Sequence, residues 1–158
     1  MTVLLADGKG GFAPARGSPV PTAERPYYLA LGDVNGDGRP DLVVAHDDDT
    51  RLTVLVGDGK GKFAPAPGPR VELGARAFGV VVADVEKDGK PDVVAAAGES
   101  VRVLSGDGRG AFRAAPGSPF AAGKGCWRLA LADLNGDGKL DVAATGLESD
   151  SVTVLLGK

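Results

Sequence analysis

The chain has 158 residues and a formal net charge of −3, and its 25 glycines and 11 prolines recur at short intervals. There is no basic stripe, so the electrostatic footprint of a nucleic-acid-binding protein is missing. No apolar stretch reaches the 18 residues of a membrane-spanning helix, so no membrane span is expected. Cys126 is the single cysteine, which excludes an intrachain disulfide, and we expect it to act as a small apolar filler.

Short apolar runs bounded by glycine and aspartate predict β-strands along the whole chain, and no segment has sustained helical periodicity. In the first complete set the strands are expected at about 27–32, 41–46, 51–57 and 62–66. The opening Thr2-Val3-Leu4-Leu5 matches Thr53-Val54-Leu55-Val56, the third of these strands, and Thr153-Val154-Leu155-Leu156 matches it again. The fold class is therefore predicted to be all-β.

An acidic loop follows the first strand of each set and occurs three times. It reads DVNGDGRPD at 33–41, DVEKDGKPD at 84–92 and DLNGDGKLD at 133–141. Side-chain oxygens stand at loop positions 1, 3, 5 and 9, and glycine stands at position 6. This spacing lets a curled backbone direct several oxygens at one hard cation such as Ca²⁺, with the position-7 carbonyl as a further donor.

The flanks of this loop distinguish it from an EF-hand. An EF-hand requires a bidentate glutamate at position 12 and a helix on each side, whereas position 12 here is Val44, Ala95 or Ala144 and the flanks predict strands. The expected element is a β-hairpin whose turn holds calcium, with position 9 as the last carboxylate. The alternative is a solvated turn without metal. It is disfavoured because clustered acidic side chains repel one another without a counterion.

The repeat extends beyond the loop. Gly-rich turns begin at Asp7, Asp58 and Asp107, each 26 residues before the first aspartate of an acidic loop. The steps between them are 51 and 49 residues, and four short strands in about 50 residues is the period of a β-propeller blade. The predicted units are a partial blade at about 1–19, two blades at 20–69 and 70–119, and a partial blade at 120–158.

The run LALGDVNGDGRPDLVVA followed by LTVLVGDGKGKFAPA resembles the FG-GAP/VCBS repeats of integrin-alpha-like β-propellers. In that family the loop joins the first and second strands of a blade and binds calcium. Glu86 departs from the pattern, where the other two loops have asparagine. The resemblance implies three Ca²⁺ sites with these ligands: Asp33, Asn35, Asp37, Arg39 and Asp41; Asp84, Glu86, Asp88, Lys90 and Asp92; Asp133, Asn135, Asp137, Lys139 and Asp141.

Three acidic loops are fewer than the four to eight blades of a closed propeller, so we expect a partial or oligomer-completed propeller. Three explanations remain open. The chain is part of a longer propeller, or copies of it complete one another's blades in a homo-oligomer, or it forms an open arc with exposed sheet edges.

The sequence offers little for catalysis, and we expect no enzymatic activity. His46 is the single histidine and is expected to lie exposed in a hairpin tip beside three aspartates. No nucleophile elbow is present. The Gly-rich segment 57–61 lacks the spacing of a phosphate-binding loop and is interpreted as a hairpin turn.

An aromatic residue stands six positions before each acidic loop, at Tyr27, Phe78 and Trp127, at the strand end opposite the loop. We interpret the three as wedges between blades. A ligand rim is expected beside them from Arg25, Tyr28, Arg76 and Arg128.

The resemblance implies a calcium-stabilised, non-catalytic interaction or adhesion scaffold. Its location would be extracellular or at the cell surface, although Met1-Thr2-Val3 follows no secretory signal in this chain. The expected partner is a protein or carbohydrate. The alternatives are the propeller part of a secreted, polysaccharide lyase-like carbohydrate-active enzyme and a lectin-like sugar-binding propeller.

Overall fold

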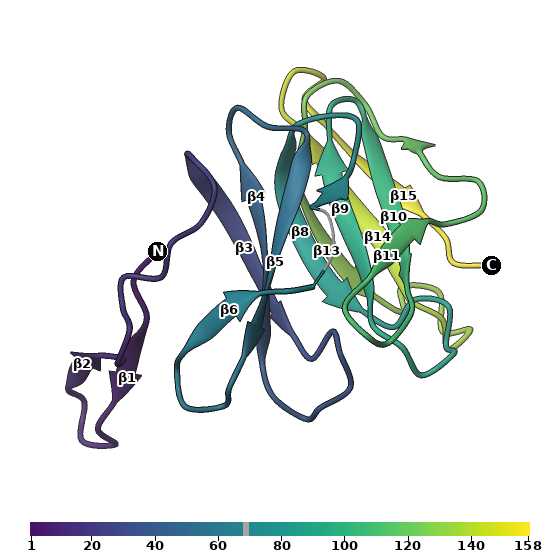
Figure 1. Cartoon of the computed structure of the whole chain (residues 1–158). Helices are drawn as coiled ribbons and strands as arrows, with labels where there is room; N and C mark the ends of the chain where they lie inside the picture. Colours follow the sequence, from purple (N-terminus) through teal and green to yellow (C-terminus); the bar gives the residue numbers. More distant parts are fainter. Residues whose placement is uncertain (68–69) are drawn as a thin grey trace.

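The computed structural model describes residues 1–67 and 70–158, and within these ranges every regular element is a β-strand (Figure 1). The strands are β1 (Leu4–Ala6), β2 (Phe12–Pro14), β3 (Pro26–Gly32), β4 (Asp41–His46), β5 (Arg51–Gly57), β6 (Phe63–Pro65), β7 (Val71–Glu72), β8 (Ala77–Ala83), β9 (Asp92–Ala97), β10 (Ser100–Gly106), β11 (Phe112–Ala114), β12 (Phe120–Ala121), β13 (Cys126–Ala132), β14 (Asp141–Gly146) and β15 (Ser151–Leu155). The all-β prediction is confirmed.

The strands form four antiparallel sheets. Sheet I is the hairpin β1–β2, sheet II has the order β3-β4-β5-β6, sheet III has the order β8-β9-β10-β11, and sheet IV has the order β13-β14-β15. Two short strands lie off these paths, because β7 pairs with β5 and β12 pairs with β10. The fourth position of sheets II and III is thus shared by two short strands along one edge.

Sheets II, III and IV stand side by side with their faces in contact, as the blades of a propeller do, and do not close into a ring, whereas the hairpin of sheet I projects away from them (Figure 1). Each strand has one apolar face toward each neighbouring sheet, so both sides of β4 and β9 are buried. This double burial explains why these strands read as continuous apolar runs and not as alternating ones. The open arc agrees with partial propeller blades.

Each of sheets II, III and IV has a front face, which in sheets II and III points toward the next sheet along the chain, and a back face, which in sheets III and IV points toward the preceding one. Equivalent residues of the repeat lie on the same face in each sheet. The front face of sheet II, with Val43, Ala45, Leu52 and Val54, packs on sheet III. The back face of sheet III, with Val80, Val93 and Ala95, receives it. The front face of sheet III packs in the same way on the back face of sheet IV, through these residues: Val94, Ala96 and Val101 against Cys126, Leu129, Leu131, Val142 and Ala144.

The amino-terminal segment covers part of the back face of sheet II. Met1, Val3 and Val20 pack there against Leu42, Val44 and Leu55, with Phe63 at the edge. Val3 is equivalent to Val54, so the segment occupies the position of the third strand of a preceding blade. The part of this back face formed by β3, the first strand of the sheet, stays uncovered.

One sequence prediction about a single residue is wrong. His46 is not exposed in a hairpin tip, because it ends β4 and only 1% of its surface is accessible. Its ring nitrogens contact the carbonyl oxygen of Glu24 at 2.8 Å and the hydroxyl of Thr53 at 2.9 Å. The acidic neighbours that suggested exposure begin one residue later, at Asp47, where the turn starts.

Cys126 lies fully buried between sheets III and IV, as a small apolar filler should. Its burial raises the pKa of its thiol. The predicted boundary between the units 20–69 and 70–119 falls on residue 69, outside the described residues. Within the described ranges no helix is long and apolar enough to cross a bilayer.

Candidate metal loops and aromatic–arginine cluster

The three acidic loops lie between the first and second strands of sheets II, III and IV, which is the predicted place. In the first loop the Asp33 carboxylate accepts hydrogen bonds from the backbone N–H groups of Gly36, Asp37 and Gly38 at 2.8, 3.1 and 2.7 Å. The amide of Asn35 donates to Asp37 at 3.1 Å. The side chains of positions 1, 3 and 5 are therefore gathered within one curl of backbone.

The same arrangement recurs in the third loop. Asp133 accepts from Gly136 and Gly138 at 2.7 and 2.8 Å, and the amide of Asn135 donates to Asp137 at 3.3 Å. These backbone donors, Gly138 first among them, lower the pKa of Asp133 below its usual value. Glycines 36, 38, 136 and 138 all have φ between 75° and 84°, a region that residues with a Cβ avoid.

The aspartate at position 9 of each loop also has a structural role, which was not predicted from the sequence. Asp41 is fully buried, and its two carboxylate oxygens accept the N–H groups of Val34 at 2.9 Å and Gly57 at 2.8 Å. Asp92 and Asp141 make the matching bonds in the other units, to these donors: Val85 and Gly106, and Leu134 and Gly157. The residue ties the acidic loop to the end of the third strand of its own sheet.

Position 7 places a cation beside the aspartate of position 5 in each loop. Arg39 lies 3.8 Å from Asp37, Lys90 lies 3.2 Å from Asp88, and Lys139 lies 3.9 Å from Asp137. The backbone N–H of Lys90 and then its ammonium group lower the pKa of Asp88. The position-7 side chains are exposed, so each of these ion pairs lies at the surface of its loop.

The middle loop differs from its neighbours in more than one residue. The carboxylate of Glu86 accepts a hydrogen bond from the Ser105 hydroxyl at 2.8 Å and does not contact Asp88 as the asparagines contact their aspartates. Position 4 is Lys87, which has φ of 56° where the other loops have glycine. Burial raises the pKa of Asp92, although backbone N–H groups oppose the effect. The position-3 oxygen is thus directed away from the curl.

The donor set of the loops suits calcium, since it consists of carboxylate, amide and carbonyl oxygens on a tight turn. As arranged here, the carboxylates are turned onto backbone N–H groups. Among the described residues no three histidine, cysteine, aspartate or glutamate side chains are grouped closely enough to form a metal cluster by themselves. Each carboxylate oxygen still has a second lone pair to offer. The loop residues therefore fit a Ca²⁺ ion in their chemistry.

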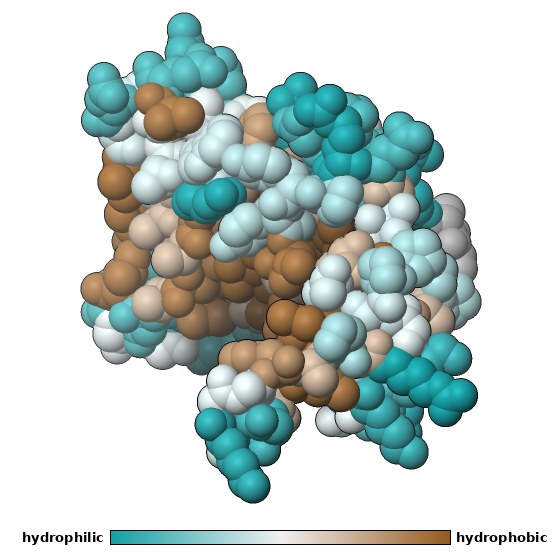
Figure 2. Space-filling model, turned by 90° about the vertical axis from the view of Figure 1, so that its left-hand side faces the viewer, coloured by the Kyte–Doolittle hydropathy of each residue, from teal (hydrophilic) through white to brown (hydrophobic). Residues whose placement is uncertain are grey.

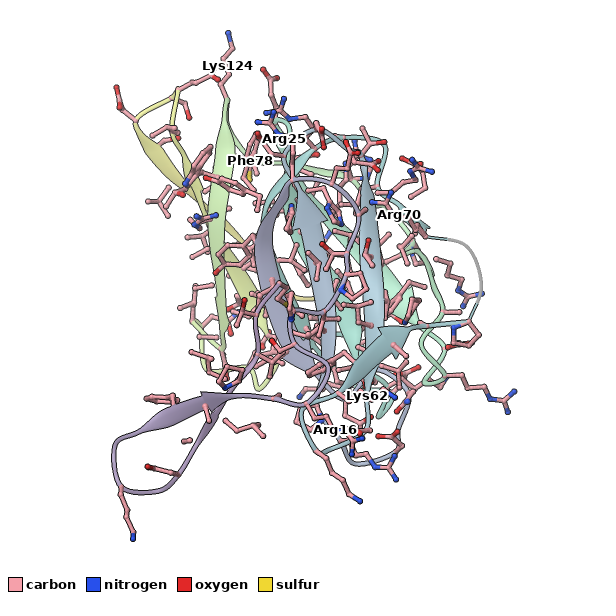
Figure 3. The ribbon with its side chains drawn as sticks, turned by 60° about the vertical axis from the view of Figure 1, so that its left-hand side comes forward. Arg16, Arg25, Lys62, Arg70, Phe78 and Lys124 are labelled. Atoms are coloured by element: carbon pink, nitrogen blue, oxygen red, sulfur yellow. The ribbon has the colours of Figure 1, made fainter. Side chains whose placement is uncertain are left out.

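The three aromatic residues lie in the first strand of each sheet, at the strand end opposite the acidic loop, and their rings meet there. The rings of Phe78 and Trp127 stack with centroids 4.7 Å apart, and Tyr27 meets both edge-on at 6.0 and 5.9 Å. They belong to β3, β8 and β13, so they join three consecutive sheets. Figure 3 shows Phe78 beside Arg25 at one end of the sheets and Lys62 at the other. The interpretation as inter-blade wedges agrees with these contacts.

The four predicted rim residues lie around these rings in two pairs. The guanidinium of Arg128 lies 4.4 Å from the centroid of Tyr28 and also bonds the carbonyl oxygen of Phe78. Arg25 and Arg76 both bind Asp47, and Arg76 also lies 5.4 Å from the Phe78 centroid. We call Tyr27, Tyr28, Arg76, Phe78, Trp127 and Arg128 the aromatic–arginine cluster. Its arginines are already engaged by aromatic rings or aspartate.

Two features of the site were missed from the sequence. One is the bond from position 9 to the third strand, and the other is the role of Asp47 in holding Arg25 and Arg76. A signal for the first exists in the repeat, because a glycine ends the third strand in every unit at Gly57, Gly106 and Gly157. A Cβ at Gly57 would overlap the carbonyl oxygen of Pro40, so only glycine allows this approach.

Repeated antiparallel sheets packed face to face, each with an acidic loop at the same turn, define a protein of β-propeller-like repeats. The FG-GAP-like repeat family model matches the chain three times, at residues 1–44, 33–95 and 84–144. The chain therefore belongs to the FG-GAP repeat family. None of the curated proteins compared with it matches.

Proposed function

We propose that the chain is a calcium-stabilised scaffold that binds a partner molecule without catalysing a reaction on it. The observation that carries the proposal is the threefold recurrence of one loop with the same oxygen donors and the same hydrogen bond to the third strand. Calcium that binds the folded state alone would stabilise it by about 2.7 kcal/mol per site at a hundredfold excess over Kd. Such a loop rigidifies a blade and leaves little room for a substrate on the metal.

The absence of catalysis is supported by the state of the two most reactive side chains. His46 is buried with both ring nitrogens occupied, and Cys126 is buried in an apolar contact between two sheets. Neither side chain is accessible to a molecule bound at the surface, since His46 is 1% and Cys126 0% exposed. While they hold calcium, the aspartates of the loops are poor candidates for general acid–base work.

We place the binding of the partner at the aromatic–arginine cluster. Blades of a repeat scaffold are alike except where they serve a particular partner, and the position after each inner aromatic varies among Tyr28, Gly79 and Arg128. An extracellular or cell-surface location and a role in adhesion suit the calcium requirement, because millimolar extracellular calcium would fill sites with Kd in the range of about 10⁻⁴ to 10⁻³ M. The partner we favour is a protein.

A binding array that carries extracellular matrix proteins and glycans, probed in calcium buffer, tests the proposal. We expect a specific signal that the double variant Tyr28→Ala, Arg128→Ala loses while its calcium stoichiometry stays the same. The matched control Arg39→Ala changes a cation at the opposite end and should keep the signal. If Arg39→Ala lost binding and the double variant kept it, the partner would bind at the acidic-loop end, which would contradict the proposal.

Sugar binding is the second candidate, and the half-exposed ring of Tyr27 beside Arg128 favours it. Aromatic faces stack on the apolar faces of sugar rings, and an arginine can bind their carboxylates. A signal on the glycan part of the array alone would select this candidate. Turnover of a polysaccharide by the chain would instead select the carbohydrate-active enzyme.

A further inference from the structure

The front face of sheet IV is apolar and uncovered. Val152 is 64% exposed, although its equivalent Leu52 in sheet II is 1% exposed beneath sheet III. Val154 is also exposed, whereas its equivalent Val54 is buried. The rest of this face consists of small side chains, Ala130, Ala132 and Ala143, with Thr145 at one end. The face thus repeats the chemistry of a surface that is packed against a blade elsewhere in the chain.

The back face of sheet II is uncovered over its inner strand. Leu29 is 44% exposed, although its equivalent Val80 in sheet III is 2% exposed. Leu31 is exposed beside it. Figure 2 shows an apolar, hollowed surface on this side of the molecule, and Met1, Pro26 and Val44 help to line a hollow there. The equivalent back faces of sheets III and IV are covered by the front faces of sheets II and III.

The two exposed faces match each other in shape as well as in polarity. Within the chain, Gly32 on the front face of β3 lies directly against the Val82 side chain on the back face of β8, so close that a Cβ on Gly32 would overlap it. The equivalent positions between sheets III and IV are Ala83 and Leu131, and those across the two exposed faces are Ala132 and Leu31, so the pair is again an alanine and a leucine. Small side chains on the inner strand of one face therefore meet large ones on the other.

We propose that the front face of sheet IV in one copy of this chain packs on the back face of sheet II in a second copy, head to tail. The contact continues the series in which sheet II packs on sheet III and sheet III packs on sheet IV. A second copy is the occupant because both halves of the interface are present on one chain, in the register that its own sheets use. Neither half carries a charge in its centre that another partner would be needed to neutralise.

One pair of strands competes in this assembly. β15 of the first copy and β1 of the second are equivalent, and both would fill the third position of the same blade. β1 pairs with β2 over three residues, whereas β15 pairs with β14 over five, so we expect β1 to yield. β2 would then pair with β15 in the register that β6 keeps with β5, which sets Leu155 opposite Pro14.

This exchange costs little because equivalent residues make the same contacts. Val3 donates to the Ser18 hydroxyl and accepts from Ala15, and Val154 stands at the equivalent position to do both. The assembly then gains the burial of Leu29 and Leu31, which the amino-terminal segment leaves exposed. Exchange of like elements between copies is a low-cost route to an oligomer.

Light scattering coupled to size exclusion, over a range of micromolar concentrations in buffer with and without calcium, tests the proposal. We expect a mass of at least twice the 15.9 kDa of one chain. Val154→Asp on the front face and Leu31→Asp on the back face should each give monomers. Both positions are exposed in one chain, so circular dichroism should show both variants folded. Leu147→Asp is the control, because Leu147 is 63% exposed in the turn before β15, outside both faces.

Mixing the two monomeric variants is the decisive step. A head-to-tail interface leaves one intact pair of faces in the mixture, so Val154→Asp and Leu31→Asp should form a heterodimer together. A wild-type monomer throughout the range would overturn the proposal and assign the faces to other occupants, such as further blades. Failure of the mixture to associate, or dissociation by Leu147→Asp, would overturn it as well.

Discussion

Asp41 and Gly57 are joined by a hydrogen bond of 2.8 Å from the glycine N–H to the buried carboxylate, and the same bond recurs as Asp92 with Gly106 and Asp141 with Gly157. It connects the end of each acidic loop with the end of the third strand of the same sheet. The bond therefore holds the end of the loop in a fixed position against the sheet. This preorganisation reduces the ordering cost that binding must overcome.

The first prediction concerns this carboxylate. Asp41→Ala leaves the N–H groups of Val34 and Gly57 buried without acceptors, so in calcium-free buffer the free energy of unfolding should fall by about 2 to 4 kcal/mol. Asp37→Ala, at an exposed position of the same loop, should cost less than about 1 kcal/mol in the same buffer. Urea unfolding measures both. Equal losses for the two variants would show that the buried bond has no special role.

The second prediction separates the loops from one another. Asp37→Ala, Asp88→Ala and Asp137→Ala should each lower the calcium stoichiometry measured by titration calorimetry by one. Blades in a repeat protein contact only their neighbours, so the remaining loops should keep their ions. Loss of every site from one of these variants while it stays folded would contradict independent binding.

The third prediction concerns the middle loop. Because the Ser105 hydroxyl holds Glu86 away from Asp88, this loop should bind calcium more weakly than the other two. Glu86→Asn should raise its affinity toward that of its neighbours, and Ser105→Ala should raise it by a smaller step. Calorimetry on a background of Asp37→Ala and Asp137→Ala isolates this loop. An affinity that falls in Glu86→Asn would show that the longer carboxylate is the better ligand.

The fourth prediction is a pH dependence at the end of the sheets opposite the acidic loops. Hydrogen bonds from Arg51 first, and then from Arg70, lower the pKa of Asp49 from 3.8 to about 2. A carboxylate with a lowered pKa stabilises the fold above its unfolded value, and this contribution is lost as the pH falls from 3.8 toward 2. Asp49→Asn should lower the melting temperature at pH 6, and the difference from wild type should shrink between pH 4 and pH 2. A constant difference would contradict the pairing.

The order of strands could be predicted from the sequence because the 51- and 49-residue steps align every strand with its equivalents. The short strands β7 and β12 could not, since two residues such as Val71 and Glu72 carry no period. His46 was misassigned because its burial depends on Thr53, on the neighbouring strand, and on Glu24, 22 residues away. The donor residues of the loops were local and visible, whereas the partner of Asp41 became evident only with the sheet.

The rim residues show the same limit. Position in the repeat correctly brought Tyr28 and Arg128 together, but sequence could not show that Asp47 takes both Arg25 and Arg76. Whether a charged side chain near the rim is free or forms an ion pair depends on residues in turns that are distant in sequence, such as the turn after β4 that contains Asp47. Whether they recognise a partner stays a prediction.

The central claim is that the three acidic loops bind calcium and thereby stabilise the blades. Thermal unfolding of the chain in millimolar calcium and again in excess EGTA, with bound metal counted by elemental analysis, tests it most directly. The account predicts three calcium ions per chain and a markedly lower melting temperature in EGTA. Identical melting curves together with no bound metal would contradict it.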